Sequence, residues 1–466
     1  MGTAIGYDIK HLMKKPLSIT LPLLLGCVLQ SSAAPTQPNI VLFVADDMGF
    51  QDCGVYGGKD IPTPNMDSLA KNGVRFTHAY TSGCVCSPTR AGLMTGRYQQ
   101  RFGFDANAEG QTAAADQGPR ALDFRQVTFA QRMKTLSYTT ALFGKWHLGA
   151  SPGYLPTERG FDEFYGYLPF GIGAGGPGGP PIYRGTNVVA TPKNHMEQFC
   201  AEALSFIDRQ QAKPFLLYLP FSAVHGPMVG PEPWLSQFSH LTPPNRRKYA
   251  ADLAQMDDVI GRVMARLHER GLEEYSLVFF FSDNGGPGGP ARNEPLRGTK
   301  WTLWDGGIHV PFIVQWKGRI PAGRVVDHPV IQVDILPTAV AAAGGEIKPE
   351  WKLDGVNLLP CLEGTSPTPP HEALYWRFGV QYAIRQGDWK LVKPHLNSAP
   401  QLFNLIHDPG EQTDLASVDA DKARKLQALW DAWNVNNEPP RWIDNRWNGD
   451  GPAARKAAAK TKKRQP

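Results

Sequence analysis

The stretch NIVLFVADD (residues 39–47) decides the fold, because an almost entirely apolar run ends abruptly in two aspartates. The same construction recurs at residues 215–220 and at residues 276–282, where Asp283 and Asn284 follow. Apolar runs of this length without alternation are typical of strands that are buried on both faces. They therefore predict the central strands of a largely parallel sheet.

Segments with helical periodicity separate these runs, at residues 127–136, 196–209 and 246–270. Alternation of strands and helices along a chain is typical of an α/β domain. We therefore expect a large, mostly parallel sheet flanked by helices.

The pattern changes after residues 353–355, where short aromatic-rich segments replace the long apolar runs. Such segments predict a smaller, antiparallel C-terminal sheet that is followed by one helix. The four expected strands are residues 374–378, 382–385, 389–393 and 401–404, and the expected helix is residues 421–433.

The sequence suggests four parts. Residues 1–34 contain lysines, an apolar run and small residues, which is the pattern of a secretory signal. We expect a catalytic domain at residues 35–360, a C-terminal subdomain at 361–440 and a basic flexible tail at 441–466. The protein is therefore expected to be exported, either to the periplasm or to the outside of the cell. Cys27 lies in a segment that resembles a bacterial lipoprotein box, so a lipid anchor stays open.

The net charge of +5 does not indicate a nucleic-acid-binding core. Residues 453–466 contain six basic and no acidic groups, and residues 1–34 contain three lysines against one aspartate. The remainder of the chain is therefore acidic. We expect no nucleic-acid partner.

The motif CSPTRAGLMTGR (residues 86–97) predicts the start of a helix. Pro88 fits the first turn, where a missing N–H costs nothing, and Cys86 then lies at the end of the helix that favours negative charge. Arg90 falls one turn further along the same face. The pattern is typical of a site for anionic substrates, although an ordinary small cysteine at a helix start would have the same spacing.

Two acidic pairs offer ligands for a hard metal ion. Asp46 and Asp47 follow one predicted strand, and Asp283 and Asn284 follow another. Ligands collect at the carboxyl ends of parallel strands, and oxygen ligands suit Ca²⁺ best. Each pair alone would more often be a turn or a helix cap.

The segment GKWHLG (residues 144–149) follows a strand-like run. Extended geometry would direct Lys145 and His147 to one face and Trp146 to the other. One face would then carry an ammonium group and an imidazole. In isolation, a surface lysine and a structural histidine would be the more common explanation of the segment.

Together these motifs resemble the type I sulfatases, whose signature is Cys-x-Pro-x-Arg followed by Thr-Gly-Arg. Cys86, Pro88, Arg90 and residues 95–97 match it, and Thr89 stands where the family usually has serine. The Gly-Lys-Trp-His element, the order of the two acidic pairs and residues 402–411 match as well. The resemblance implies an alkaline-phosphatase-like fold and conversion of Cys86 to formylglycine.

The resemblance also implies a role for each candidate residue. In such an enzyme Lys145, Lys300 and His225 contact the sulfate, and His225 or Lys300 protonates the leaving group. Asp283 acts as the base, His147 assists turnover of the formylglycine, and Arg90 holds its hydrate. One Ca²⁺ is held by Asp46, Asp47, Cys86, Asp283 and Asn284.

The expected activity is calcium-dependent hydrolysis of a sulfate monoester. The expected substrate is a sulfated carbohydrate or another sulfate ester, and the expected partner is a formylglycine-generating or sulfatase-maturating enzyme. Two alternatives stay open. The same fold and metal pairs would serve a phosphonate or phosphodiester hydrolase, and a protein with unconverted Cys86 would serve only to bind sulfoglycans. His309 is expected to be structural.

Overall fold

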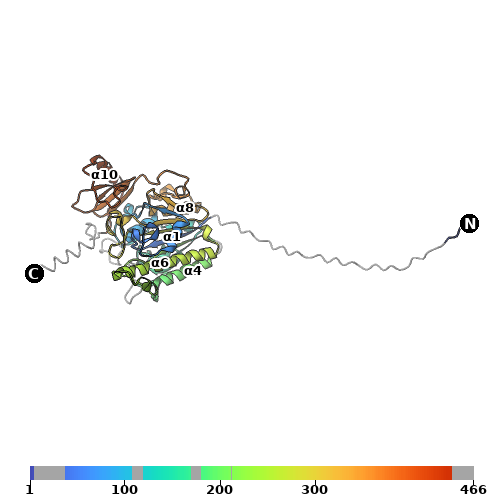
Figure 1. The fold of residues 1–466 in the computed structure, drawn as a ribbon. Helices are drawn as coiled ribbons and strands as arrows, with labels where there is room; N and C mark the ends of the chain where they lie inside the picture. The colour runs from blue at the N-terminus through green and yellow to red at the C-terminus, as the bar shows by residue number, and fades with distance from the viewer. Residues whose placement is uncertain (5–36, 108–118, 169–179, 211–212, 443–466) are drawn as a thin grey trace. The chain divides into compact units, whose positions relative to one another are not determined.

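Strand β1 (Asn39–Ala45) lies between β8 (Phe215–Pro220) and β9 (Ser276–Ser282), and it pairs with both in parallel. The computed structural model describes residues 1–4, 37–107, 119–168, 180–210 and 213–442 (Figure 1). Apart from residues 1–4 and 441–442, the expected signal with Cys27 and the expected basic tail lie outside the described residues. The three apolar runs thus form the centre of the sheet, as predicted.

Within the described residues, the large sheet has the strand order β11-β2-β10-β9-β1-β8-β4-β5-β6-β7. The block from β9 to β5 is parallel, whereas β10, β6 and β7 pair antiparallel with their neighbours. The prediction of a mostly parallel sheet is therefore confirmed. Its other strands are β2 (Val74–Phe76), β4 (Thr139–Lys145), β5 (Glu163–Tyr167), β6 (Ile182–Arg184), β7 (Asn187–Val189), β10 (Phe312–Gln315) and β11 (Arg324–Val326).

Helices cover both faces of this sheet, so the alternate side chains of β1 enter two separate cores. Ile40, Leu42 and Val44 pack with the helices of one face, and Val41, Phe43 and Ala45 pack with those of the other. Figure 1 shows α4 and α6 side by side along the sheet. The first face carries α2 (Cys86–Thr95), α3 (Phe129–Thr135) and α8 (Ile335–Ala342), and the second carries α1 (Pro64–Lys71), α4 (His195–Arg209) and α6 (Pro244–Glu269).

Local capping explains where the helices depart from the predicted limits. The α3 helix begins two residues later than expected, because the Thr128 hydroxyl accepts the Gln131 N–H and the Gln131 side chain accepts the Thr128 N–H. The α6 helix begins earlier than expected, at Pro244, a residue type that suits the first helical position. Both helices exist where the periodicity predicted them.

The C-terminal antiparallel sheet is also confirmed. It has the order β13-β14-β15-β16 and packs against α10 (Ala420–Asn434) around a third core, which also includes Tyr80, Leu303 and Ile331 of the larger domain. The Trp376 indole donates to the Thr81 carbonyl at 2.7 Å, which ties this sheet to the segment before α2. The strands are β13 (Leu374–Phe378), β14 (Gln381–Gln386), β15 (Trp389–Lys393) and β16 (Gln401–Asn404).

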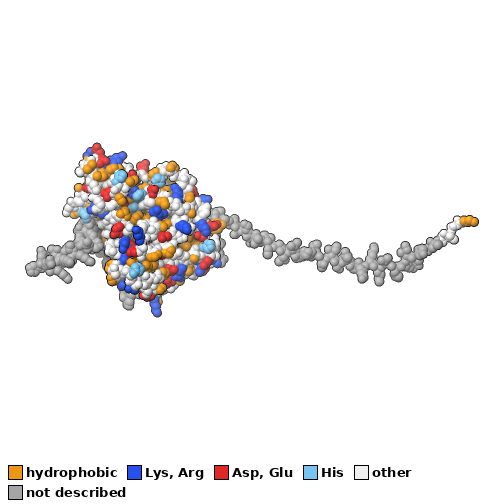
Figure 2. Space-filling view, in the orientation of Figure 1, with side chains coloured by type: hydrophobic (Ala, Val, Ile, Leu, Met, Phe, Trp, Pro, Cys, Tyr) orange, Lys and Arg blue, Asp and Glu red, His pale blue; other side chains and the backbone are white. Residues whose placement is uncertain are grey.

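The remaining described strands and α-helices are short. They are β3 (Ala79–Tyr80), β12 (Val330–Ile331), α5 (Trp234–Gln237), α7 (Asp305–Ile308) and α9 (Leu359–Glu363). No helix in the described ranges has the length and apolar character that crossing a bilayer requires. Figure 2 shows basic and acidic side chains interspersed over the visible face.

One glycine shows how tightly the central strands approach each other. Gly144 in β4 has a φ of 138°, and a Cβ at this position would lie 2.0 Å from the Pro220 carbonyl oxygen of β8. Gly271 also has a positive φ, 66°, but a Cβ there would meet no atom within 4 Å. A side chain at Gly271 would therefore meet backbone strain alone, whereas a side chain at Gly144 would meet both strain and a steric clash.

We predict that Gly144→Ala lowers the free energy of unfolding by about 3 kcal/mol or more, because strain and overlap with the backbone add. Gly271→Ala should cost only about 1–2 kcal/mol, the usual penalty of a left-handed conformation. Urea denaturation of the two variants measures the difference. Equal losses would contradict the close approach of β4 and β8.

Candidate active site

The carboxyl ends of three parallel strands and the start of one helix meet at a single place. Asp46 and Asp47 directly follow β1, and Asp283 and Asn284 directly follow β9. The Asp283 N–H donates to the Ala45 carbonyl at 3.0 Å, so the parallel register brings the two acidic pairs together. Lys145 is the last residue of β4, and Cys86 is the first residue of α2.

Cys86 lies at the centre of this group. Its Sγ is 3.3 Å from Asp46 Oδ1 and 3.3 Å from Lys300 Nζ, and the residue is 1% exposed. The helix start also has a partner that the sequence did not reveal, since Asn107 Oδ1 accepts the Ser87 N–H at 3.0 Å. The predicted helix start at Cys86 is confirmed.

The candidate metal ligands lie close together. One potential ligand atom from each of Asp46, Asp47, Cys86 and His225 lies within 4.8 Å of all the others. His225 was expected near the sulfate but not among these ligand atoms. Asp283 is held beside the group, because its Oδ1 accepts the Asp47 N–H at 3.2 Å.

Each buried carboxylate has its own buried cation. Lys145 Nζ is 2.5 Å from Asp46 Oδ2, and Lys300 Nζ is 2.7 Å from Asp47 Oδ1. Arg90 donates from Nε and Nη2 to Asp283 Oδ2, at 3.0 and 2.8 Å. A buried charge is costly without a partner, so this one-to-one pairing permits three carboxylates in one small volume.

The three buried carboxylates differ in pKa. Burial alone would raise the pKa of Asp46 and of Asp47, but the neighbouring cations, chiefly Lys145 for Asp46 and Lys300 for Asp47, hold both below the ordinary value. Burial and the charge of Asp46 raise the pKa of Asp283 to about 6, against the opposing effect of Arg90. Asp283 is thus the carboxylate that can exchange a proton near neutral pH.

The thiol and the two imidazoles are neutral in this environment. Burial, Asp283 and Asp46 raise the pKa of the Cys86 thiol well above its ordinary value. Burial lowers the pKa of His147 and of His225, and the charge of Lys145 lowers that of His147 further. Both imidazoles are therefore proton acceptors at neutral pH.

The backbone is strained at the site. Asp47 and His147 have φ values of 67° and 62°, and Trp301, which follows Lys300, has a φ of 79°. Left-handed conformations are uncommon outside glycine and concentrate at functional sites. The expected extended geometry of His147 is therefore wrong, because the chain turns after Lys145. Trp146 lies in the core, where its indole N–H donates to the Tyr154 carbonyl at 2.9 Å.

Two further side chains near the site, those of His309 and Tyr218, contact the surrounding protein. His309 Nε2 is 2.8 Å from the Thr77 carbonyl, and its Nδ1 is 3.3 Å from Asp305, which confirms the structural role expected for it. Tyr218 was not anticipated. Its hydroxyl is 3.5 Å from Arg90 Nη1, on the side chain that holds Asp283.

A buried network supports the segment after Lys300. Lys390 Nζ is 2.6 Å from Asp305 Oδ1 and 2.8 Å from Glu411 Oε1, and Glu411 Oε2 accepts the Asp305 N–H at 2.7 Å. Two carboxylates therefore share one ammonium group. Burial, with the charge of Asp305, raises the pKa of Glu411 to about 7.

The residues present fit a hard divalent cation. The Asn284 amide group donates to Asp47 Oδ1 at 2.8 Å and to the Gly285 carbonyl at 2.9 Å. Its Oδ1 is buried and has no hydrogen-bond donor among the described residues. An oxygen left without a donor beside two ionised carboxylates is what a cation with oxygen ligands requires.

Comparisons with known proteins agree with this geometry. The family model described as Sulfatase matches residues 38–345, and the model described as N-sulphoglucosamine sulphohydrolase, C-terminal, matches residues 299–432. The N-acetylgalactosamine-6-sulfatase of Canis lupus familiaris is 32% identical over 457 residues, which cover 86% of each chain.

Among the solved structures that resemble this fold, two are informative. The structure of Ps i-CgsB in complex with k-i-k-neocarrahexaose has a TM-score of 0.82 and 29% identity, and the match covers 91% of this chain and 99% of that one. The phosphonate monoester hydrolase of Agrobacterium radiobacter has a TM-score of 0.61 and 22% identity, with 86% and 95% covered. The second likeness concerns the fold alone, which is alkaline-phosphatase-like.

We predict that Glu411→Gln changes how stability depends on pH. Because the folded protein raises the pKa of Glu411 from 4.5 to about 7, it binds this proton more tightly than the unfolded chain does. This contribution to the unfolding free energy is present below pH 4.5 and is lost as the pH rises through 7. The wild type should therefore lose stability relative to Glu411→Gln across this window.

Urea denaturation at several pH values measures this effect, with the exposed Glu346→Gln as the control. The control should follow the wild type throughout. Parallel curves for the wild type and Glu411→Gln would show that Glu411 ionises in the folded protein as it does in the unfolded chain.

Proposed function

Since this chain belongs to the sulfatase family and is a sulfuric ester hydrolase, we propose that it cleaves sulfate monoesters of carbohydrates with a formylglycine made from Cys86 and one Ca²⁺. The observation that carries the proposal is the position of Cys86. Its sulfur lies between a carboxylate and an ammonium group at a helix start, in a cluster with paired charges.

The unmodified thiol is a poor nucleophile here. A cysteine attacks as the thiolate, and this environment raises the pKa of the Cys86 thiol well above neutrality. Oxidation to formylglycine would supply, in the hydrated form, a hydroxyl oxygen in place of the sulfur. The structure therefore favours an oxygen nucleophile at position 86 over the thiol itself.

The proposed ligands of the ion are Asp46, Asp47, residue 86, Asp283 and Asn284, with His225 next to them. When bound, Ca²⁺ would neutralise charge on the sulfate oxygens. The low pKa values of Asp46 and Asp47 keep these ligands ionised. The oxygen of Asn284 that lacks a donor adds a neutral ligand.

The protein's own cations would bind the sulfate group. Lys145 and Lys300 lie on either side of the acidic pair, and both are buried, so their charges act in a site with little water. Fixed charges in such a site stabilise developing negative charge without reorganisation. Arg90 instead orients Asp283 through two hydrogen bonds that converge on its Oδ2. We assign it a positioning role rather than the expected contact with the hydrate.

Proton transfer would involve three groups. Asp283, with a pKa of about 6, is ionised above that pH and would accept a proton from the attacking hydroxyl. Of the two expected acids, Lys300 Nζ is the protonated one and would donate to the leaving oxygen as the S–O ester bond breaks. His225 Nε2, 3.6 Å from Asp47 Oδ2 on a side chain that is 19% exposed, would first have to take up a proton, because its imidazole is neutral. His147 is neutral and buried, and it would accept the proton released when the nucleophile is regenerated.

Two of the relatives support carbohydrate as the substrate class. One is named for N-acetylgalactosamine, and another binds neocarrahexaose in its crystal structure. Both match at least 86% of this chain. The phosphonate hydrolase resembles only the fold, so sulfate esters are favoured over phosphonates. The proposal also includes export and a maturating enzyme as partner, on the signal-like residues 1–34 and the Cys86 motif.

We predict that Cys86→Ala lowers the rate of sulfate release on the order of 10³-fold or more, because it removes the nucleophile. Cys361→Ala, which removes a cysteine at α9, should retain activity. Sulfate release from a panel of defined sulfated sugars measures both. A fully active Cys86→Ala protein would refute the proposed nucleophile.

We predict that Ca²⁺ stabilises the folded protein, by about 2.7 kcal/mol at 100 times its Kd. Asp47→Asn should abolish this gain, since it removes a ligand charge, whereas Asp258→Asn on α6 should preserve it. Thermal unfolding with Ca²⁺ and with a chelator gives the comparison. Identical unfolding temperatures and activities under both conditions would argue against a calcium site.

A further inference from the structure

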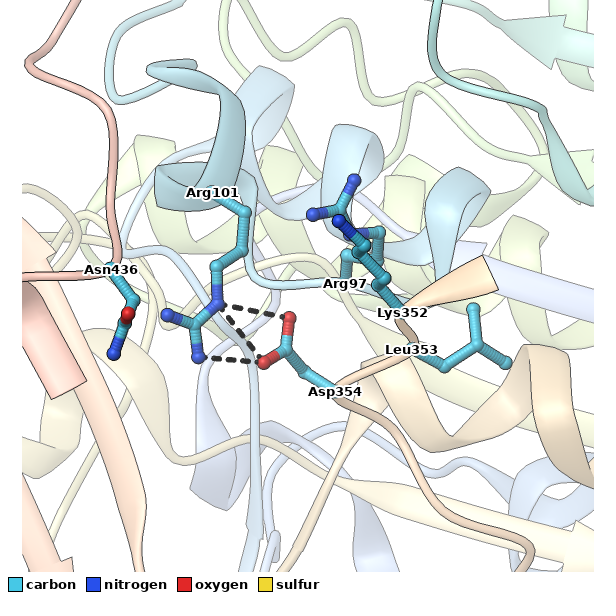
Figure 3. A pocket seen from close by; sticks show the side chains of 6 residues that line it. All are labelled: Arg97, Arg101, Lys352, Leu353, Asp354 and Asn436. Atoms are coloured by element: carbon cyan, nitrogen blue, oxygen red, sulfur yellow. Dashed lines mark hydrogen bonds and ion pairs between the residues drawn. The ribbon is translucent and has the colours of Figure 1, made fainter. Parts of the chain in front are cut away.

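A second cationic cavity lies beyond the far end of α2. It has a volume of about 440 Å³ and is lined by Arg97, Arg101, Lys352, Leu353, Asp354 and Asn436 (Figure 3). The α2 helix has ten residues, which corresponds to about 15 Å at 1.5 Å per residue, and Cys86 stands at its opposite end. The cavity is therefore separate from the cluster around Cys86.

The single carboxylate that lines this cavity, Asp354, is already paired with a cation. Arg101 donates to Asp354 Oδ1 from Nε at 3.1 Å and from Nη2 at 2.8 Å, and the Tyr98 N–H donates to Asp354 Oδ2 at 3.0 Å. Figure 3 shows the Arg101 guanidinium facing this carboxylate. Asp354 thus compensates Arg101 and leaves the other two cations of the cavity uncompensated.

Arg97 and Lys352 have no carboxylate within ion-pair distance among the described residues. Arg97 Nη1 donates to the neutral Gln126 Oε1 at 3.0 Å, and its buried Nε has no acceptor in the described part of the chain. Lys352 is exposed and has a left-handed backbone with a φ of 50°. The cavity therefore presents two positive charges that lack a carboxylate partner. It also contains the Asn436 amide, whose Nδ2 donates one hydrogen bond to the Ala432 carbonyl at 3.1 Å.

A further cation increases this excess. The Arg132 guanidinium stacks on the Trp351 ring at 3.9 Å, and its buried Nε likewise finds no acceptor among the described residues. Burial and the charge of Arg97 lower the pKa of Arg132 to about 10. The positive charges of Arg97 and Arg132 repel each other because burial leaves them only partly hydrated. An anion in the cavity would reduce this repulsion.

We propose that the cavity formed by Arg97, Arg101, Lys352 and Asn436 is a second oxyanion site that binds a sulfate group. A guanidinium fork and an ammonium group suit tetrahedral oxyanions, and charge-assisted hydrogen bonds of this kind are the strong ones. The sulfate group is either free inorganic sulfate or a sulfate ester on the carbohydrate. The inference concerns binding alone and does not depend on formylglycine or on Ca²⁺.

The test compares sulfate binding by the wild type and by Arg97→Gln/Lys352→Gln. Isothermal titration of the calcium-loaded protein with sodium sulfate should show a second binding site that the variant loses, with an affinity reduced about tenfold or more. Lys193→Gln/Arg270→Gln removes two exposed cations next to α4 and α6 and should bind as the wild type does. Lys352→Gln alone changes an exposed side chain, so it tests the site even if the double variant does not fold.

Selenate soaked into crystals of the wild type should give an anomalous peak within hydrogen-bond distance of Arg97. Unchanged sulfate binding in Lys352→Gln and in the double variant, together with an empty cavity in the selenate crystals, would overturn the proposal. A peak with no difference in solution binding would identify an adventitious ion only and would overturn it as well.

Kinetics distinguish the two sources of the sulfate group. If the site binds the carbohydrate, the double variant should raise KM for a polysulfated oligosaccharide about tenfold and leave KM for a monosulfated monosaccharide unchanged. If it binds free sulfate, both KM values should stay unchanged and only the sulfate titration should differ. Either pattern supports the second site.

Discussion

The parallel register of β1 and β9 is the constraint on which the rest of the site depends. The hydrogen bond from the Asp283 N–H to the Ala45 carbonyl fixes the strand ends side by side, so two acidic pairs meet in a buried position. Three carboxylates in such a volume repel one another. The surrounding elements must therefore provide cations, and the fold does so from three directions: Arg90 on α2, Lys145 on β4 and Lys300 on the loop before α7.

Because its charged groups come from separate elements, the site depends on the packing of both the large sheet and the C-terminal sheet. Removing one partner from a buried ion pair is strongly destabilising, typically by about 3–5 kcal/mol. The C-terminal sheet takes part, since Lys390 and Glu411 hold the segment that follows Lys300. The same pairing sets the chemistry, because it leaves Asp46 and Asp47 ionised and gives Asp283 a pKa near 6. One carboxylate is thereby reserved for proton exchange.

Much of the fold could be predicted from the sequence, because buried strands, helical periodicity and caps are local signals. The strands around Asp46 and Asp283 and the helix start at Cys86 follow from such signals. The left-handed conformation of His147 could not be predicted, because neither residue 146 nor residue 148 is a glycine or a proline that would mark a turn. Nor could the sequence reveal that Asn107 binds the start of α2, or that His225 lies beside Asp47, since these contacts join segments far apart in the chain.

The central claim is that position 86 carries an aldehyde in the working enzyme. Mass spectrometry of the tryptic peptide from Phe76 to Arg90, taken from protein of measured activity after thiol alkylation, tests it most directly. We predict one alkylated thiol, at Cys84, and at position 86 an aldehyde that reacts with a hydrazide. Fully active protein with alkylated thiols at both positions would contradict the account.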